Sequence, residues 1–278
     1  MIFKNAMSFK SKIKQIAKEK GITTSQAQQN YLIEVFLMKL AYSEYSTNFI
    51  VKGGFLIGSL IGIDMRTTMD LDATLKGTEL TIDNLERIIK EILTVQVETS
   101  FTLIYDKISE IREGDDYPGF RVKLKVQFEK INEFVTIDIT TGDVITPKEM
   151  LFKFNRMFND PDLILLTYPI ETVLSEKIQT ILSRGVASTR PRDYYDVYIL
   201  SKLQKDNINS IMLKEAIINT CTKRKTKKVL DESSLIIKEI LNSDFQREMW
   251  LKYQNQYKYA RDTSFEEVVD AVKLLLEN

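Results

Sequence analysis

The sequence contains no histidine and only one cysteine, Cys221. The absence of histidine excludes Ser-His-Asp and Cys-His catalysis, a histidine general base and histidine-ligated zinc. A single cysteine allows neither a disulfide within the chain nor a cysteine-cluster zinc site. An enzyme with this composition must rely on carboxylates, lysine, arginine and a hard metal ion. Phosphoryl-type transfer suits that restriction, because its catalysis depends largely on positioning and on neutralising charge.

Long apolar runs are also missing, and so is an excess of charge of either sign. No stretch approaches the apolar length that crosses a membrane, and the lysine-rich N-terminus lacks the apolar centre of a signal peptide. The 278 residues, 44% hydrophobic and 28% charged, are typical of a globular protein with one large domain or two lobes. We therefore expect a cytoplasmic protein with no membrane partner.

The stretch from Phe49 to Leu75 organises the N-terminal half. It predicts a short strand, a glycine pair, a short helix, a loop and a second strand that carries Asp70 and Asp72. Residues two apart on a strand project from the same face, so these two carboxylates lie together. Adjacent carboxylates repel each other unless a cation lies between them, and Mg2+ is usually bound through a few carboxylates and substrate phosphates. The alternative is an ordinary polar strand edge.

The glycine pair, Gly53 and Gly54, follows the first strand and begins the helix. Backbone N–H groups at a helix start can bind an anion, and glycine permits close approach there. The alternative is a tight strand-to-helix turn without a ligand. A later strand, from Val135 to Ile139, repeats the pattern of alternation and projects Asp138 from one face. If this strand lies beside the first acidic strand, Asp138 supplies a third carboxylate; otherwise it is an isolated strand residue.

The chain is expected to become mostly helical after Pro147, which suggests one lobe over residues 1–150 and a second over 151–278. A helix that begins at Pro169 places Lys177 on its apolar face. Its amine can escape to water, pair with Asp193 or Asp196 on the next helix, or bind the phosphate of a nucleotide. We favour the phosphate. The last seventy residues predict four helices, and the basic block Lys223–Lys228 is either a solvated face or an RNA contact.

Several of these motifs, in this order, resemble those of the AbiEii/AbiGii toxins, which belong to the DNA polymerase β-type nucleotidyltransferase superfamily. The matching residues are Gly53-Gly54, Gly58-Ser59, Arg66-Thr67-Thr68, Asp70-Leu71-Asp72, Glu176-Lys177 and Arg192-Asp193-Tyr194-Tyr195-Asp196. The resemblance implies an α+β fold, with an N-terminal nucleotidyltransferase-type mixed sheet, flanking helices and a helical C-terminal lobe. It also implies a site in the cleft between the lobes.

The resemblance further implies the toxin of a type IV toxin–antitoxin system used in abortive phage infection. Such a toxin is expected to bind a nucleoside triphosphate, GTP above all, with Mg2+ and to transfer a nucleotide to RNA, most simply tRNA. Its antitoxin is expected to act without a stable complex. A nucleotidyltransferase that modifies protein, or a non-catalytic nucleotide- or RNA-binding module, stays open as an alternative.

The resemblance also assigns expected roles to individual residues. In that family the motif lysine and aspartate are required for toxicity. The expected metal ligands are Asp70 and Asp72. The expected catalytic residues are Asp70, Asp72, Asp138, Lys177, Asp193 and Asp196. The expected nucleotide-binding residues are Gly53, Gly54, Gly58, Ser59, Arg66, Thr68, Lys177 and Arg192.

Overall fold

The computed structural model describes residues 1–111, 119–158 and 160–277, which form two compact units. The sheet unit comprises Met1–Gly142 and Met150–Thr167 and contains all of the described strands. The helical unit comprises Asp143–Glu149 and Tyr168–Asn278. No helix in the described ranges has both the length and the apolar character needed to cross a bilayer.

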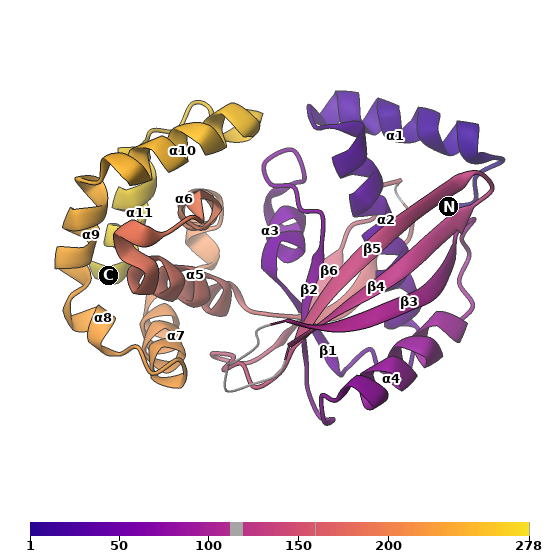
Figure 1. Ribbon diagram of the computed structural model, residues 1–278, viewed down its shortest axis with the longest axis horizontal. Coiled ribbons are helices and arrows are strands. Elements are labelled where there is room, and N and C mark those ends of the chain that lie inside the picture. Colours follow the sequence, from indigo (N-terminus) through magenta and orange to yellow (C-terminus); the bar gives the residue numbers. More distant parts are fainter. Residues whose placement is uncertain (112–118, 159, 278) are drawn as a thin grey trace. The chain divides into compact units, whose positions relative to one another are not determined.

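A mixed sheet forms the centre of the sheet unit (Figure 1). It has seven strands in the order β3-β4-β5-β2-β1-β7-β6. Its strands are β1 (Phe49–Lys52), β2 (Leu71–Leu75), β3 (Thr102–Ile111), β4 (Gly119–Phe128), β5 (Ile131–Thr140), β6 (Met150–Phe154) and β7 (Leu163–Thr167). Its helices are α1 (Ala6–Lys20), α2 (Thr24–Ala41), α3 (Gly53–Ile61) and α4 (Ile82–Thr94). Strand β2 pairs with β5, and β1 with β7, in parallel; the other neighbours are antiparallel. The expected α+β fold with an N-terminal mixed sheet is confirmed.

Alternation along β4 and β5 gives the sheet one buried face. Val122, Leu124 and Val126 of β4 are fully buried, as are the apolar residues of β5 opposite them. Helix α2 passes behind these strands in Figure 1 and covers that face. The residues between, among them Arg121 and Asp138, therefore project from the opposite face, which we call the open face. The same alternation is visible in the sequence of residues 121–127, where every second residue is apolar.

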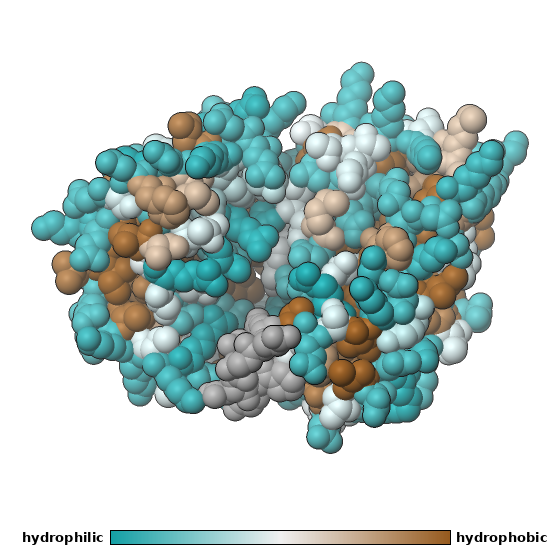
Figure 2. Space-filling view, in the orientation of Figure 1, coloured by the Kyte–Doolittle hydropathy of each residue, from teal (hydrophilic) through white to brown (hydrophobic). Residues whose placement is uncertain are grey.

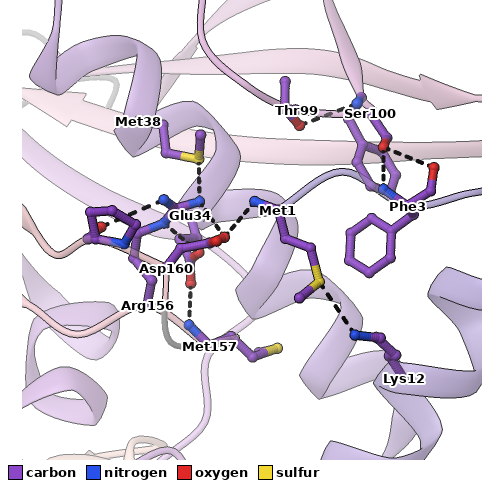
Figure 3. Close-up of polar contacts among 12 residues, drawn as sticks. Met1, Phe3, Lys12, Glu34, Met38, Thr99, Ser100, Arg156, Met157 and Asp160 are labelled. Carbon is purple, nitrogen blue, oxygen red and sulfur yellow. Dashed lines mark hydrogen bonds and ion pairs between the residues drawn. The ribbon is translucent and has the colours of Figure 1, made fainter.

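Helix α2 is buried along most of its length, including two charged side chains. Lys39 donates to the carbonyls of Leu93 and Val95 at the end of α4, at 3.1 and 2.5 Å, where helix carbonyls lack partners within the helix. Glu34 accepts from Arg156 Nε at 3.0 Å and from the backbone N–H of Met157 at 2.8 Å (Figure 3). Both buried charges therefore have polar partners, and Glu34 ties the segment after β6 to the central helix.

The expectation that the chain becomes mostly helical after Pro147 is wrong for residues 150–167. Strands β6 and β7 lie there and complete one edge of the sheet. Both are five-residue segments that are apolar except for Lys153 and Thr167, and they are too short for periodicity to separate a strand from a helix turn. Strand β3 is continuous over Thr102–Ile111 and has a bulge between Tyr105 and Lys107.

The helical unit contains α5 (Ile170–Arg184), α6 (Pro191–Leu203), α7 (Ser210–Lys223), α8 (Lys228–Asp231), α9 (Ser233–Leu241), α10 (Asp244–Gln256) and α11 (Phe265–Glu277). The four C-terminal helices expected from the sequence correspond to α7, α9, α10 and α11, while the short α8 was not expected. Trp250 is buried and donates its indole N–H to the carbonyl of Thr263 at 3.0 Å. Its ring therefore belongs to the core of this unit.

Candidate functional site

Four charged side chains form one row across four adjacent strands of the open face. Strand pairing sets Lys52 of β1 opposite Asp72 of β2, Asp72 opposite Asp138 of β5, and Asp138 opposite Arg121 of β4. Directly paired residues project from the same face and lie side by side. The strand of Asp138 therefore lies beside the first acidic strand, which is the arrangement that the sequence required for Asp138 to supply a third carboxylate. The row places two carboxylates between two cations.

Arg121 holds the carboxylate of Asp138 in a two-point contact. Its Nε lies 2.8 Å from Oδ1, and a terminal nitrogen lies 2.7 Å from Oδ2. The hydrogen bond and charge of Asp138 raise the pKa of the Arg121 guanidinium, and Asp70 and Asp72 add to this effect. Three carboxylates therefore act on one guanidinium. Sequence reasoning missed Arg121, although its alternation with the buried residues of β4 was a usable signal.

Gly53 is required by its backbone conformation and by its contact with Asp72. Its φ is +67°, and a Cβ at this position would lie 2.0 Å from Oδ2 of Asp72. Any other residue would be destabilised by the left-handed backbone conformation, and its Cβ would collide with the carboxylate. The glycine turn therefore seats Asp72 at the start of α3, which brings the glycine pair and one expected metal ligand into direct contact.

The loop from Arg66 to Thr68 packs against α3 through the other two glycines. A Cβ on Gly54 would lie 3.0 Å from the Thr68 hydroxyl, and one on Gly58 would lie 2.6 Å from the Arg66 carbonyl. Thr68 donates its hydroxyl to Oδ1 of Asp70 at 2.7 Å. The loop thus connects the glycine-rich helix to Asp70. Gly58 has a packing role here, which the phosphate-binding expectation did not include.

Two further residues of this region, Ser59 and Lys52, donate hydrogen bonds to neighbouring groups. Ser59 donates its hydroxyl to the Phe55 carbonyl of its own helix at 2.9 Å. Lys52 is buried, and its ammonium donates to the hydroxyl of Thr140 at 2.7 Å. A buried cation beside Asp72 is a feature that sequence reasoning missed. Its position directly before Gly53 and Gly54 could have indicated it.

In the helical unit, Lys177 bridges both acids of α6. Its Nζ lies 2.6 Å from Oδ1 of Asp193 and 2.9 Å from Oδ2 of Asp196. Arg190 also contacts Asp193, with Nε 2.6 Å from Oδ2. The side chain of Asp193 is 1% exposed and that of Asp196 is 0% exposed. Burial opposes ionisation of Asp193, but the Lys177 and Arg190 cations outweigh it and lower the pKa of its carboxyl.

Two other motif residues of this unit, Arg192 and Glu176, have different surroundings. Arg192 is exposed, so Arg190 is the arginine that contacts Asp193. Glu176 pairs with Arg224, whose terminal nitrogen lies 2.7 Å from Oε1. Arg224 also donates to Gln179 at 2.6 Å. One member of the basic block Lys223–Lys228 is therefore engaged in holding α5 to α7.

The sequence matches the family model described as nucleotidyl transferase AbiEii toxin, type IV toxin–antitoxin system, over residues 35–271. The chain belongs to this family. The AbiEii match spans both units. It includes the glycine pair, the four residues of the charged row, and Lys177 with its partners Asp193, Asp196 and Arg190. Among curated proteins, none matches this sequence.

Two solved structures have the same fold as this AbiEii family member. The crystal structure of JHP933 from Helicobacter pylori has 14% identity and a TM-score of 0.52, with 92% of this chain and 93% of that chain covered. A candidate nucleotidyltransferase from H. pylori has 15% identity and a TM-score of 0.51, with coverage of 92% and 96%. At these identities the likeness concerns the fold alone. The fold therefore extends over nearly the full length of all three chains.

For an AbiEii nucleotidyl transferase, the group to test against the site is a divalent metal ion. The described residues contain no cluster of three or more acids, cysteines or histidines able to hold a metal without other ligands. Asp70 and Asp72 are half-buried, and Thr68 orients Asp70. Asp138 lies beside them but is engaged by Arg121. A set of two carboxylates fits Mg2+, which retains waters and takes further oxygens from substrate phosphates.

Proposed function

We propose that this protein is the toxin of a type IV toxin–antitoxin system and acts in the cytoplasm as a Mg2+-dependent nucleotidyltransferase. It takes a nucleoside triphosphate, GTP above all, and transfers the nucleotide to a hydroxyl group of RNA, with tRNA as the acceptor and pyrophosphate as the leaving group. The observation that carries the proposal is the strand register that sets Asp72 beside Asp138, next to the Gly53 turn. Carboxylates and a glycine turn supply the positioning and charge that nucleotide transfer requires.

Asp70 and Asp72 are the residues that would hold Mg2+, which supplies positive charge for the phosphates of the nucleotide. The backbone of Gly53 and Gly54, at the start of α3, would receive phosphate oxygens. Asp72 and Thr68 lie against these two glycines, so a side chain at either position would displace the residues around the metal. In this scheme Gly58, Ser59 and Arg66 support the glycine-rich helix and its loop.

Asp138 is proposed to accept the proton of the attacking hydroxyl group. The two contacts with Arg121 fix the plane of its carboxylate. Each carboxylate oxygen keeps a second lone pair for that proton. Arg121 is therefore a positioning residue in this scheme, because it acts on the reaction through Asp138.

Lys177, Asp193, Asp196 and Arg192 are proposed to form the nucleotide contacts of the helical unit. Lys177 and Arg192 would contact phosphates, and the two acids would hold Lys177 in place when no nucleotide is bound. An antitoxin that opposes the product of the reaction, without a stable complex with the toxin, completes the proposed system.

The test is to incubate the protein with each of four α-labelled nucleoside triphosphates, Mg2+, tRNA and total cell protein, and to see which macromolecule is labelled. We expect label on tRNA, loss of label with EDTA, and no label with Asp72→Asn or Asp70→Asn. Both variants should remain folded, because they remove charge from a half-buried, like-charged group. Label on protein alone, or transfer by a folded Asp70→Asn/Asp72→Asn double variant, would contradict the proposal.

A further inference from the structure

The open face of β3 and β4 carries a line of cations beside the charged row. Lys123 and Lys125 follow Arg121 at intervals of two on β4, so all three side chains share this face. Strand pairing sets Lys107 of β3 directly opposite Lys123. Residues two apart on a strand lie about 7 Å apart, a spacing comparable with that of successive phosphates in an extended nucleic acid strand.

An exposed phenylalanine lies among these lysines. Phe134 of β5 is paired with Lys125 and is 42% exposed, although its strand neighbours Val135 and Ile137 are fully buried. The Lys123 ammonium lies 3.7 Å from the centroid of the Phe134 ring. An aromatic ring held among cations is the arrangement with which proteins stack bases while they bind the phosphate backbone. We call Lys107, Lys123, Lys125 and Phe134 the basic strand face.

The positive charge of the basic strand face is not neutralised by nearby acids. Neither Lys107 nor Lys125 forms an ion pair with any residue in the described parts of the chain. Glu133 of β5 projects from the other face and accepts from Gln28 of α2 at 2.9 Å. In Figure 2 the surface over the sheet unit is mainly hydrophilic, with hydrophobic side chains between the polar ones. Charge complementarity therefore favours a polyanion with bases over an apolar partner.

We propose that the RNA acceptor lies along the basic strand face and reaches the charged row at Asp138. Its phosphates contact Lys107, Lys123 and Lys125, and one of its bases stacks on Phe134. The path is continuous with the row, because Lys123 is two residues from Arg121 and is paired with Thr136, two residues before Asp138. The choice of RNA rests on the proposed function; the location rests on the strand register and the exposed ring.

The charge contribution is tested by binding of an end-labelled oligouridylate, followed by fluorescence anisotropy over a range of KCl without nucleotide or Mg2+. The variant is Lys107→Gln/Lys123→Gln/Lys125→Gln. Its matched control, Lys10→Gln/Lys14→Gln/Lys18→Gln, removes three exposed lysines from α1. The slope of log affinity against log salt should fall by about 2 in the first variant, since each phosphate contact on a single strand contributes about 0.7. The control should keep the wild-type slope.

The stacking contribution is tested with the same probe. Phe134→Ala should weaken binding about tenfold, and Phe134→Tyr should bind like the wild type, because tyrosine retains a ring of similar shape. Both variants should melt within a few degrees of the wild type, since Phe134 is 42% exposed. An unchanged affinity of Phe134→Ala, an equal loss in the α1 control, or no RNA binding by the wild type would overturn the inference.

A competition with polyglutamate separates RNA from an acidic protein as the occupant. Preferential binding of the oligouridylate supports the inference, and equal competition overturns it. The proposed function fails separately: RNA binding through this face without labelled product would contradict the transfer reaction and leave the surface assignment standing. Conversely, transfer to tRNA with a wild-type KM in the triple lysine variant would overturn the surface assignment while the transfer reaction stands.

Discussion

Arg121 and Asp138 face each other on antiparallel strands β4 and β5 and form a two-point ion pair at 2.8 and 2.7 Å. The two contacts fix the plane of the Asp138 carboxylate, and Asp70 and Asp72 add to the effect of Asp138 on the Arg121 guanidinium. In the proposed reaction the three acids therefore have different tasks. Asp70 and Asp72 suit a metal ion that brings its own charge, and Asp138 suits a proton acceptor of fixed orientation.

Replacing Arg121 with Met should therefore reduce nucleotide transfer far more than stability. Half of the Arg121 side chain is exposed, so the pair contributes about 1 kcal/mol or less to folding. Loss of orientation at a reacting group, by contrast, can cost roughly 100-fold in rate. Single-turnover rates and denaturant unfolding of the same preparations compare the two effects. An unchanged transfer rate in Arg121→Met would remove Asp138 and its partner from the reaction.

Gly53 and Gly21 allow the contact with Asp72 to be separated from backbone strain. Both have a left-handed conformation, with φ of +67° and +64°, but only at Gly53 would a Cβ meet another group, Oδ2 of Asp72. Gly53→Ala and Gly21→Ala should each lose about 1–2 kcal/mol from the left-handed backbone. Gly53→Ala alone should also lose nucleotide transfer, because Asp72 must move. Equal activity of the two variants, measured at matched folded fractions, would show that Asp72 tolerates displacement.

The sequence predicted local patterns well and pairings between distant residues poorly. The strand-glycine-helix unit, the alternation of β4 and the last four helices follow from periods of 2 and 3.6 in the residues themselves. The contacts of Lys52, Arg121 and Arg190 depend on which strands and helices become neighbours, and the local pattern does not contain that information. Strands β6 and β7 were missed for the same reason, because short and mostly apolar segments acquire strand character from the sheet that they join.

The buried carboxyl of Glu34 gives the sheet unit a measurable pH dependence. Burial raises its pKa, against the opposing effects of the Met157 N–H and Arg156. Between the ordinary glutamate pKa and the raised one, the folded state binds more protons than the unfolded state. Stability therefore falls as the pH rises through this window.

Glu34→Gln removes that titration. The stability of the wild type relative to this variant should rise as the pH falls toward the ordinary glutamate pKa and should then level off. Thermal unfolding of both proteins between mildly acidic and neutral pH measures the difference. A difference that is constant with pH, or that has the opposite slope, would contradict the raised pKa of Glu34.

Lys177 provides the sharpest distinction between a structural bridge and a phosphate contact. If a nucleotide phosphate is its partner, as the sequence favours, Lys177→Met leaves stability almost unchanged. The contacts with Asp193 and Asp196 change that expectation, because both carboxylates are almost completely buried. Removal of the shared cation leaves Asp193 with Arg190 and removes one of the contacts that lower its pKa.

Breaking a buried ion pair from one side costs about 3–5 kcal/mol, so Lys177→Met should unfold at clearly lower denaturant concentration than the wild type. Arg192→Met is the matched control, because it removes an exposed cation from the start of α6, the helix that carries Asp193 and Asp196. It should change the free energy of unfolding by less than about 0.5 kcal/mol.

Nucleotide affinity, measured where both variants are folded, then tests the phosphate role independently. If Lys177→Met retains wild-type stability but loses nucleotide binding, the bridge contributes nothing to folding and Lys177 serves the ligand alone. If stability falls and affinity is retained, Lys177 belongs to the scaffold of the helical unit. We expect both to fall, because one ammonium group would hold the two acids and face the phosphate in turn.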